Sequence, residues 1–140
     1  MNLIKSNNFG MLEDRTPLRD EMIKGRSVFI VDNDTRMVDH LKDILENEGF
    51  GVVVAFCGEA AIAKLRKERC HCAILDYSLP DVKGDELAKS FRIEVPDMGI
   101  ILLTGFKSSI DPVKLEAFDY VFEKPVNLEA LIAAVKQITS

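Results

Sequence analysis

Four short apolar runs in this chain each lead into a polar group that could take part in phosphate or metal chemistry. The carboxylates of Asp32 and Asp76 follow two of the runs, the hydroxyl of Thr104 follows a third, and the ammonium group of Lys124 comes just after the fourth. Carboxylate oxygens are ligands for hard cations such as Mg²⁺, and a lysine ammonium group binds phosphate oxygens. Brought together, the four groups could hold a divalent cation, a phosphoryl group and its counter-charge.

The stretch from Ala73 to Gly84 indicates how such a group would be positioned. Three apolar residues lead directly into Asp76, and Pro80 and Gly84 mark a loop. A short apolar run bounded by turn residues is typical of a buried strand. Ligands bind at the carboxyl ends of the strands of a parallel sheet, so we expect Asp76 at that edge, facing solvent. One such aspartate would be an ordinary turn residue, but the recurrence of a polar group after four buried strands favours a functional site.

The hydrophobic pattern predicts the elements that position these groups. Strands are expected at residues 27–32, 52–55, 72–76, 99–103 and 119–123. Amphipathic helices are expected at residues 35–48, 58–68, 84–93, 112–117 and 128–138, the fourth of them short. Asp34 or Thr35 can cap the first helix. Near-continuous apolar strands that alternate with amphipathic helices predict an α/β fold, a parallel sheet covered by helices on both faces.

Four motifs occur in order along this pattern: Val-Asp-Asn-Asp at 31–34, Leu-Asp-x-x-Leu-Pro-Asp-x-x-Gly at 75–84, Leu-Leu-Thr-Gly at 102–105, and Lys-Pro at 124–125. Together they closely resemble the receiver domain of two-component response regulators, over about residues 27 to 139. The resemblance implies five parallel strands in the flavodoxin-like order 2-1-3-4-5, the order of a chemotaxis receiver. We therefore expect a receiver domain at 27–140. Residues 1–26 are expected to form a flexible extension, with a helical turn or two at 18–23.

The resemblance implies a role for each candidate residue. Asp76 matches the aspartate that accepts a phosphoryl group, Thr104 the hydroxyl that binds a phosphoryl oxygen, and Lys124 the lysine that pairs with the phosphate, ahead of a cis peptide bond. The cofactor implied is Mg²⁺, and its ligands would be Asp32, Asn33, Asp76 and the backbone carbonyl of Ser78. Asp81 and Gly84 are expected to be loop and turn residues.

The same resemblance implies a signalling switch rather than an enzyme with an external substrate. Such a domain catalyses its own phosphorylation from a phosphohistidine, so the expected partner is a sensor histidine kinase or a histidine phosphotransfer protein. No output domain is expected after the last helix, so the effector would be a separate protein, and a homodimer is possible. Binding to nucleic acid is not expected, because the net charge is −5 and the pI is near 5.1.

Three features depart from the common receiver pattern. Asn33 stands where an acid usually contacts the metal, which predicts weaker Mg²⁺ binding. Val121, three residues before Lys124, takes the place of an aromatic switch residue, and Tyr120 is expected on the opposite face of its strand. The segment from Thr104 to Lys124 is also slightly short. The last two features predict an altered output relay.

Composition and cysteine usage fit a protein of the cytoplasm. No apolar run approaches the length that crosses a bilayer, and no signal peptide is evident, so a cytoplasmic location without membrane insertion is expected. Cys70-His71-Cys72 could suggest a metal clip, but a further ligand pair at the usual spacing is missing. The three cysteines, Cys57, Cys70 and Cys72, are therefore expected to be buried and reduced.

Two other functions are compatible with parts of this pattern. A haloacid-dehalogenase-type phosphatase would use Asp32-Asn33-Asp34 as its Asp-x-Asp motif. That family requires a threonine where this chain has Arg36, and an acidic pair on a further strand, so it ranks lower. The second is a receiver-like docking module that never takes phosphate. Asn33 favours that function, whereas the presence of Asp76, Thr104 and Lys124 opposes it.

Overall fold

The computed structural model describes residues 25–140, so the helical turns expected at 18–23 and the extension before them lie outside the described residues. The five described strands form one parallel sheet in the order β2-β1-β3-β4-β5. They are β1 (Ser27–Val31), β2 (Gly51–Ala55), β3 (Cys72–Asp76), β4 (Gly99–Thr104) and β5 (Tyr120–Glu123). The predicted fold class and strand order are confirmed.

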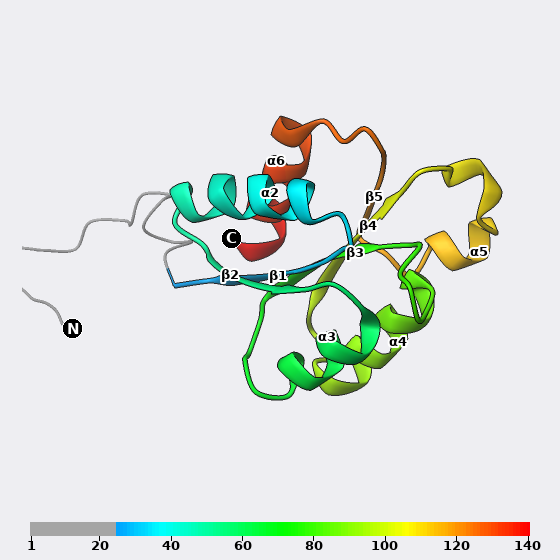
Figure 1. Ribbon diagram of the computed structural model, residues 1–140, viewed down its shortest axis with the longest axis horizontal. Coiled ribbons are helices and arrows are strands. Elements are labelled where there is room, and N and C mark those ends of the chain that lie inside the picture. The colour runs from blue at the N-terminus through cyan, green and yellow to red at the C-terminus, as the bar shows by residue number, and fades with distance from the viewer. Residues whose placement is uncertain (1–24) are drawn as a thin grey trace, which may run out of the picture.

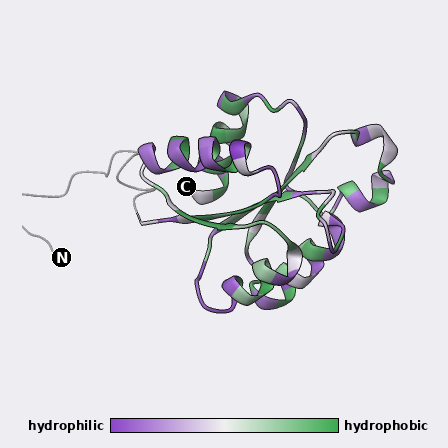
Figure 2. Ribbon diagram, in the orientation of Figure 1, coloured by the Kyte–Doolittle hydropathy of each residue, from purple (hydrophilic) through white to green (hydrophobic). Residues whose placement is uncertain are grey.

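Helices cover both faces of this sheet, as predicted (Figure 1). The helices are α2 (Thr35–Asn47), α3 (Gly58–Leu65), α4 (Gly84–Glu94), α5 (Pro112–Leu115) and α6 (Leu128–Thr139), with a 3₁₀ turn, η1 (Lys107–Ser109), before α5. Helices α2 and α6 lie on one face and α3 and α4 on the other, each pair over its own apolar core. Figure 2 shows that the strands between them are hydrophobic, whereas the outward side of α2 is hydrophilic.

Side-chain caps begin three of the helices. Asp34 caps α2 and accepts a hydrogen bond from the N–H of Met37, as predicted. Asp111 caps α5 and Asn127 caps α6 in the same way. Helix α5 is only four residues long and buries none of them, which confirms the short helix predicted after Asp111.

The fifth strand was expected to be buried, and this expectation is wrong. Strands β1 and β3 are almost completely buried, whereas the four residues of β5 are half-buried or exposed. The reason is topological: β5 is an edge strand with a single neighbour, β4. The side chains of β5 alternate between the two faces of the sheet, as predicted. Val121 packs with the core beneath α3 and α4, and Phe122 packs on the side of α2 and α6. The ring of Tyr120 stacks with that of Phe122.

The cysteines agree only in part with their prediction. All three are free thiols; Cys70 and Cys72 are buried, but Cys57, just before α3, is half-buried. Burial and the charge of Glu68 raise the pKa of Cys70 to about 11, so its thiol is protonated at neutral pH. No described helix is both long and apolar enough to span a membrane.

Candidate functional site

Strand register brings Asp32 and Asp76 to the same edge of the sheet. Val31 is paired with Leu75 in the β1–β3 ladder, so the next residue on each strand is one of the two aspartates. On the other side of β3, Asp76 is paired with Leu103 of β4, and Thr104 comes one residue later. Three neighbouring strands therefore deliver three of the predicted side chains to the carboxyl edge of the sheet, where ligands of parallel sheets bind.

Lys124 joins the two aspartates directly. Its Nζ atom donates a hydrogen bond to Oδ2 of Asp32 at 3.0 Å and lies 3.3 Å from Oδ1 of Asp76. Its backbone N–H donates to the carbonyl of Thr104 at 2.8 Å, which aligns the end of β5 with the end of β4. The Lys124–Pro125 peptide bond is cis, as the resemblance implies. One ammonium group thus faces two carboxylates from the other side of β4.

The two carboxylates of this site are shielded from water. Asp76 was expected to face solvent, but only 5% of its surface is exposed, and Asp32 is fully buried. Burial, and next the charge of Asp32, raise the pKa of Asp76, although Lys124 and the N–H of Ser78 partly offset them. Burial alone would lower the pKa of Lys124, but the hydrogen bond and charge of Asp32, followed by those of Asp76, raise it. The site therefore holds two carboxylates that a single ammonium group neutralises incompletely.

Thr104 is buried at the same edge of the sheet, and its hydroxyl already has a local partner. Its Oγ1 accepts a hydrogen bond from the N–H of Phe106 at 3.2 Å. This bond fixes the start of the loop after β4, and it leaves the hydroxyl proton available as a donor. Phe106 is 73% exposed, so it makes little contact with the rest of the protein.

The loop after Asp76 is held close to the site by α4. Gly84 begins α4, and its N–H donates to the carbonyl of Tyr77 at 2.8 Å. A Cβ atom on Gly84 would come within 2.6 Å of the carbonyl oxygen of Asp76, so only glycine permits this approach. Ser78 lies within the same loop and pairs with Lys83 across it. The expectation that Gly84 is a turn residue is thereby refined, because it sets how closely α4 packs on the loop.

One residue of this loop has a structural role that the sequence analysis missed. Asp81 accepts hydrogen bonds from the N–H groups of Gly58 and Glu59, at 2.8 and 2.9 Å, and thereby caps the N-terminus of α3. These two hydrogen bonds lower the pKa of Asp81. Cys57 occupies the local cap position of α3 but its side chain forms no capping bond. Because the cap comes from a residue more than 20 positions away, no local pattern in the sequence signals it.

The donor set of this site fits Mg²⁺. Mg²⁺ in proteins is held by one or two carboxylates, with water and phosphate oxygens completing its shell. Residues 25–140 contain no group of three or more His, Cys, Asp or Glu side chains that could hold a metal, so two carboxylates, Asp32 and Asp76, are available here. Asn33 follows Asp32 and is exposed. The side chain of Asp34 caps α2, so it is not free to supply the carboxylate that is absent at position 33.

Comparison with protein families gives one clear result: the model of the response regulator receiver domain matches residues 28–136. This chain belongs to that family. Its fold and its four motifs agree with the assignment, and it is a receiver domain of the kind found in two-component response regulators. The phosphatase alternative is disfavoured, because residues 28–136 match the receiver-domain family.

Several characterised proteins are similar to this receiver domain. The regulatory protein VanRc of Enterococcus gallinarum is 34% identical over 112 residues, which are 78% of this chain and 48% of that protein. The sensory transduction protein RegX3 of Mycobacterium tuberculosis is 33% identical over 115 residues, which are 80% of this chain and 50% of that protein. The chain therefore spans about half the length of these relatives.

Solved structures of receiver domains superpose on nearly the whole described fold. A CheY-like receiver domain from Methanospirillum hungatei is 36% identical, with a TM-score of 0.75, and the match covers 80% of this chain and 91% of that one. The response regulator TrrA of Thermotoga maritima, solved with Mg²⁺ and BeF, is 29% identical, with a TM-score of 0.74 and coverage of 81% and 98%. The TrrA structure establishes that a domain with this fold holds Mg²⁺.

Proposed function

We propose that this receiver domain accepts a phosphoryl group on Asp76 and passes a signal onward in a two-component or phosphorelay pathway. The observation that carries the proposal is the placement of Asp76 beside Asp32 and Lys124 at the carboxyl edge of the sheet. A carboxylate is a weak nucleophile, so the reaction depends on a reactive donor and on a site prepared for the charge that develops. The donor proposed is a phosphohistidine of a sensor histidine kinase or a histidine phosphotransfer protein.

The residues of the site divide this reaction among them. An oxygen of the Asp76 carboxylate attacks phosphorus, a P–O bond forms, and the P–N bond breaks, so the imidazole leaves with its electron pair. Lys124 can move from the carboxylates toward the phosphoryl oxygens, and the hydroxyl of Thr104 donates to one of them. Asp32, Asn33, Asp76 and the backbone carbonyl of Ser78 would hold Mg²⁺. When bound, that ion neutralises charge on the phosphoryl group.

A labelling experiment tests the proposal. The full chain is incubated with acetyl phosphate and Mg²⁺, and the intact mass is measured by mass spectrometry. One phosphate is expected per chain, stable to acid and labile to base, and Asp76→Asn is expected to abolish it. Burial makes the charge of Asp76 unfavourable, so this variant should still fold. Its free energy of unfolding at pH 7 should exceed that of the parent by about 0.5–2 kcal/mol. Equal labelling of the folded variant would refute the assignment.

A second candidate is a receiver-like module that docks partners without phosphorylation. It is favoured by Asn33, which leaves only two carboxylates at the site. The same experiment separates the two functions, since a docking module would remain unlabelled with acetyl phosphate and with a phosphohistidine donor at saturating Mg²⁺. Labelling by either donor would exclude it.

The proposed output passes through the segment between β4 and β5. We propose that the phosphoryl group draws the hydroxyl of Thr104 inward and that the adjoining loop and α5 then shift to a second packing. Beryllofluoride should therefore change the amide chemical shifts of residues 104–115 and those near Val121. Shifts confined to the loop around Asp32 and Ser78 would contradict this route. The effector proposed is a separate protein or a second copy of this domain, which comprises residues 27–140.

A further inference from the structure

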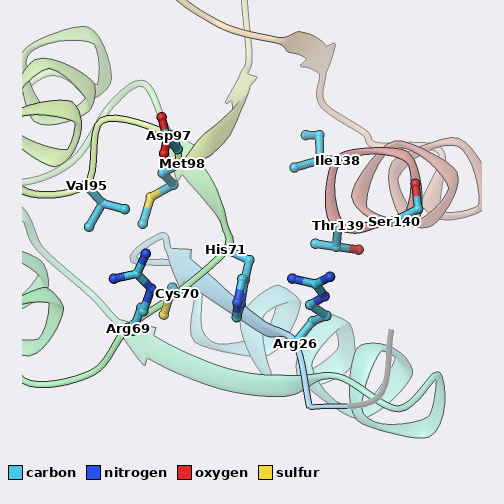
Figure 3. Close-up of a pocket in the computed structure, with 10 residues that line it drawn as sticks. All are labelled: Arg26, Arg69, Cys70, His71, Val95, Asp97, Met98, Ile138, Thr139 and Ser140. Atoms are coloured by element: carbon cyan, nitrogen blue, oxygen red, sulfur yellow. The ribbon is translucent and has the colours of Figure 1, made fainter. Parts of the chain in front are cut away.

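A second pocket lies at the edge of the sheet opposite Asp76. Its volume is about 200 Å³, and it lies between the segments that lead into β1, β3 and β4 and the last residues of α6 (Figure 3). Three of its lining residues, Val95, Met98 and Ile138, are apolar; Figure 3 shows Val95 and Met98 across the pocket from Ile138. The site described above does not use any residue of this pocket.

The pocket also contains basic residues. Arg26 precedes β1, Arg69 lies in the loop before β3, and Figure 3 shows their guanidinium groups on either side of the imidazole of His71. Asp97 and Ser140 also line the pocket, but neither arginine forms an ion pair with any residue among 25–140. Two guanidinium groups therefore line the cavity without an ion pair to any described residue.

His71 supplies a neutral hydrogen-bond donor between these cations. Its Nδ1 atom accepts a hydrogen bond from the N–H of Ser27 at 3.1 Å, which assigns the ring proton to Nε2. Burial, followed by the charges of Arg26 and Arg69, lowers the pKa of His71. The positive potential that disfavours a charged imidazole is the same potential that would attract an anion into the cavity.

We propose that this pocket binds the phosphate group of a small ligand, either a phosphomonoester or inorganic phosphate. Guanidinium groups present planar sets of donors that match several oxygens at once, and a phosphate offers oxygens to both sides of the pocket. The apolar lining residues, among them Val95 and Ile138, would contact the carbon atoms of an ester. The volume is below the 300–1,000 Å³ or so of pockets for drug-sized ligands, which selects a small ion or ester.

Binding here would act on the fold independently of Asp76. The pocket lies at the amino ends of β1 and β3, whose carboxyl ends carry the candidate phosphorylation site. A ligand that binds only the folded chain raises the free energy of unfolding. Once the ligand concentration exceeds the dissociation constant, the rise grows with the logarithm of that concentration. The melting temperature should therefore rise with phosphate concentration in the parent and in Asp76→Asn alike.

An NMR titration of the full chain tests this site. Inorganic phosphate and glycerol 2-phosphate are added in separate titrations. In each, the added compound replaces chloride salt, so that the ionic strength stays constant. Saturable amide shifts are expected at residues 69–72 and 97–99. Arg26→Gln and Arg69→Gln should each weaken binding about tenfold, which corresponds to about 1.4 kcal/mol. The control is Arg66→Gln, because Arg66 is an exposed arginine that follows α3 outside the pocket, and this variant should bind like the parent.

The two probes also distinguish the source of the phosphate. Tighter binding of glycerol 2-phosphate would assign the pocket to phosphomonoesters, and tighter binding of inorganic phosphate would assign it to the free ion. The absence of saturable shifts at residues 69–72, or equal weakening by Arg66→Gln and Arg69→Gln, would overturn the proposal. So would shifts confined to Thr104 and Lys124, because they would place the phosphate at the other edge of the sheet.

Discussion

Replacing Asn33 with aspartate should strengthen Mg²⁺ binding, and the structure sets the size of the effect. The site now holds the carboxylates of Asp32 and Asp76, both within 3.3 Å of the ammonium group of Lys124. That ammonium group competes with a metal for the same oxygens. An additional carboxylate at position 33 would add one negative charge at the metal without a further ammonium partner.

The magnitude follows from Coulomb's law and from the exposure of Asn33. Two unit charges about 4 Å apart attract by about 1 kcal/mol in bulk water and about 4 kcal/mol in a medium of effective dielectric constant near 20. Asn33 is exposed, so the lower value applies, and the double charge of Mg²⁺ raises it to about 2 kcal/mol. An affinity gain of roughly 30-fold is therefore expected. Repulsion among three carboxylates in the metal-free site would reduce this gain somewhat.

Calorimetric titration of the full chain with Mg²⁺ measures the change, and Asn47→Asp provides a matched control. Asn47 is the last residue of α2, whereas Asn33 precedes that helix. At 1.5 Å per residue, the control charge lies about 20 Å away, beyond the Debye length of about 8 Å at physiological salt. Both variants change the net charge equally, but only Asn33→Asp should bind Mg²⁺ more tightly. Equal affinity in the parent and Asn33→Asp would mean that position 33 does not contact the metal.

Three further predictions concern the scaffold around the site. Asp81→Ala should lower the melting temperature at neutral pH. Because the folded chain lowers the pKa of Asp81, that loss should shrink once the pH falls below the ordinary value of about 3.9 and vanish as the pH falls through the lowered pKa; a loss independent of pH would contradict the capping role. Asp85, in the first turn of α4, is 5% exposed; its Oδ1 atom has no hydrogen-bond partner, and its Oδ2 atom lies 3.7 Å from Nζ of Lys114. The cost of the unpaired oxygen, about 1–3 kcal/mol, exceeds the gain of about 0.3–1 kcal/mol from an acid at a helix N-terminus. Asp85→Leu should therefore raise the free energy of unfolding by about 1 kcal/mol in urea, and a decrease would show that the carboxylate is satisfied. A disulfide reagent at pH 8 should modify Cys57 rapidly and the buried Cys70 only on unfolding; rapid modification of Cys70 would contradict its raised pKa.

The sequence alone determined the elements and the family of this protein. Apolar runs such as Ile100–Leu103 and amphipathic segments such as Thr35–Asn47 can be recognised locally, because the burial of side chains follows the period of a strand or a helix within the segment itself. The order of the four motifs then specified the receiver fold. The motif spacing also located Asp76, Thr104 and Lys124, and the assignment of roles to them remains a prediction until labelling is done.

Only the tertiary structure decided which distant side chains meet. Lys124 contacts Asp32 across 92 positions of the chain, and Asp81 caps α3 from more than 20 positions away. The same is true of the burial of Asp85 and of the basic pocket between Arg26 and Arg69. Sequence periodicity reports which face of an element is apolar, but it carries no information on which loop will lie against a given helix end. That depends on how the layers pack, because the connecting loops are brought together by the sheet and not by their own sequences.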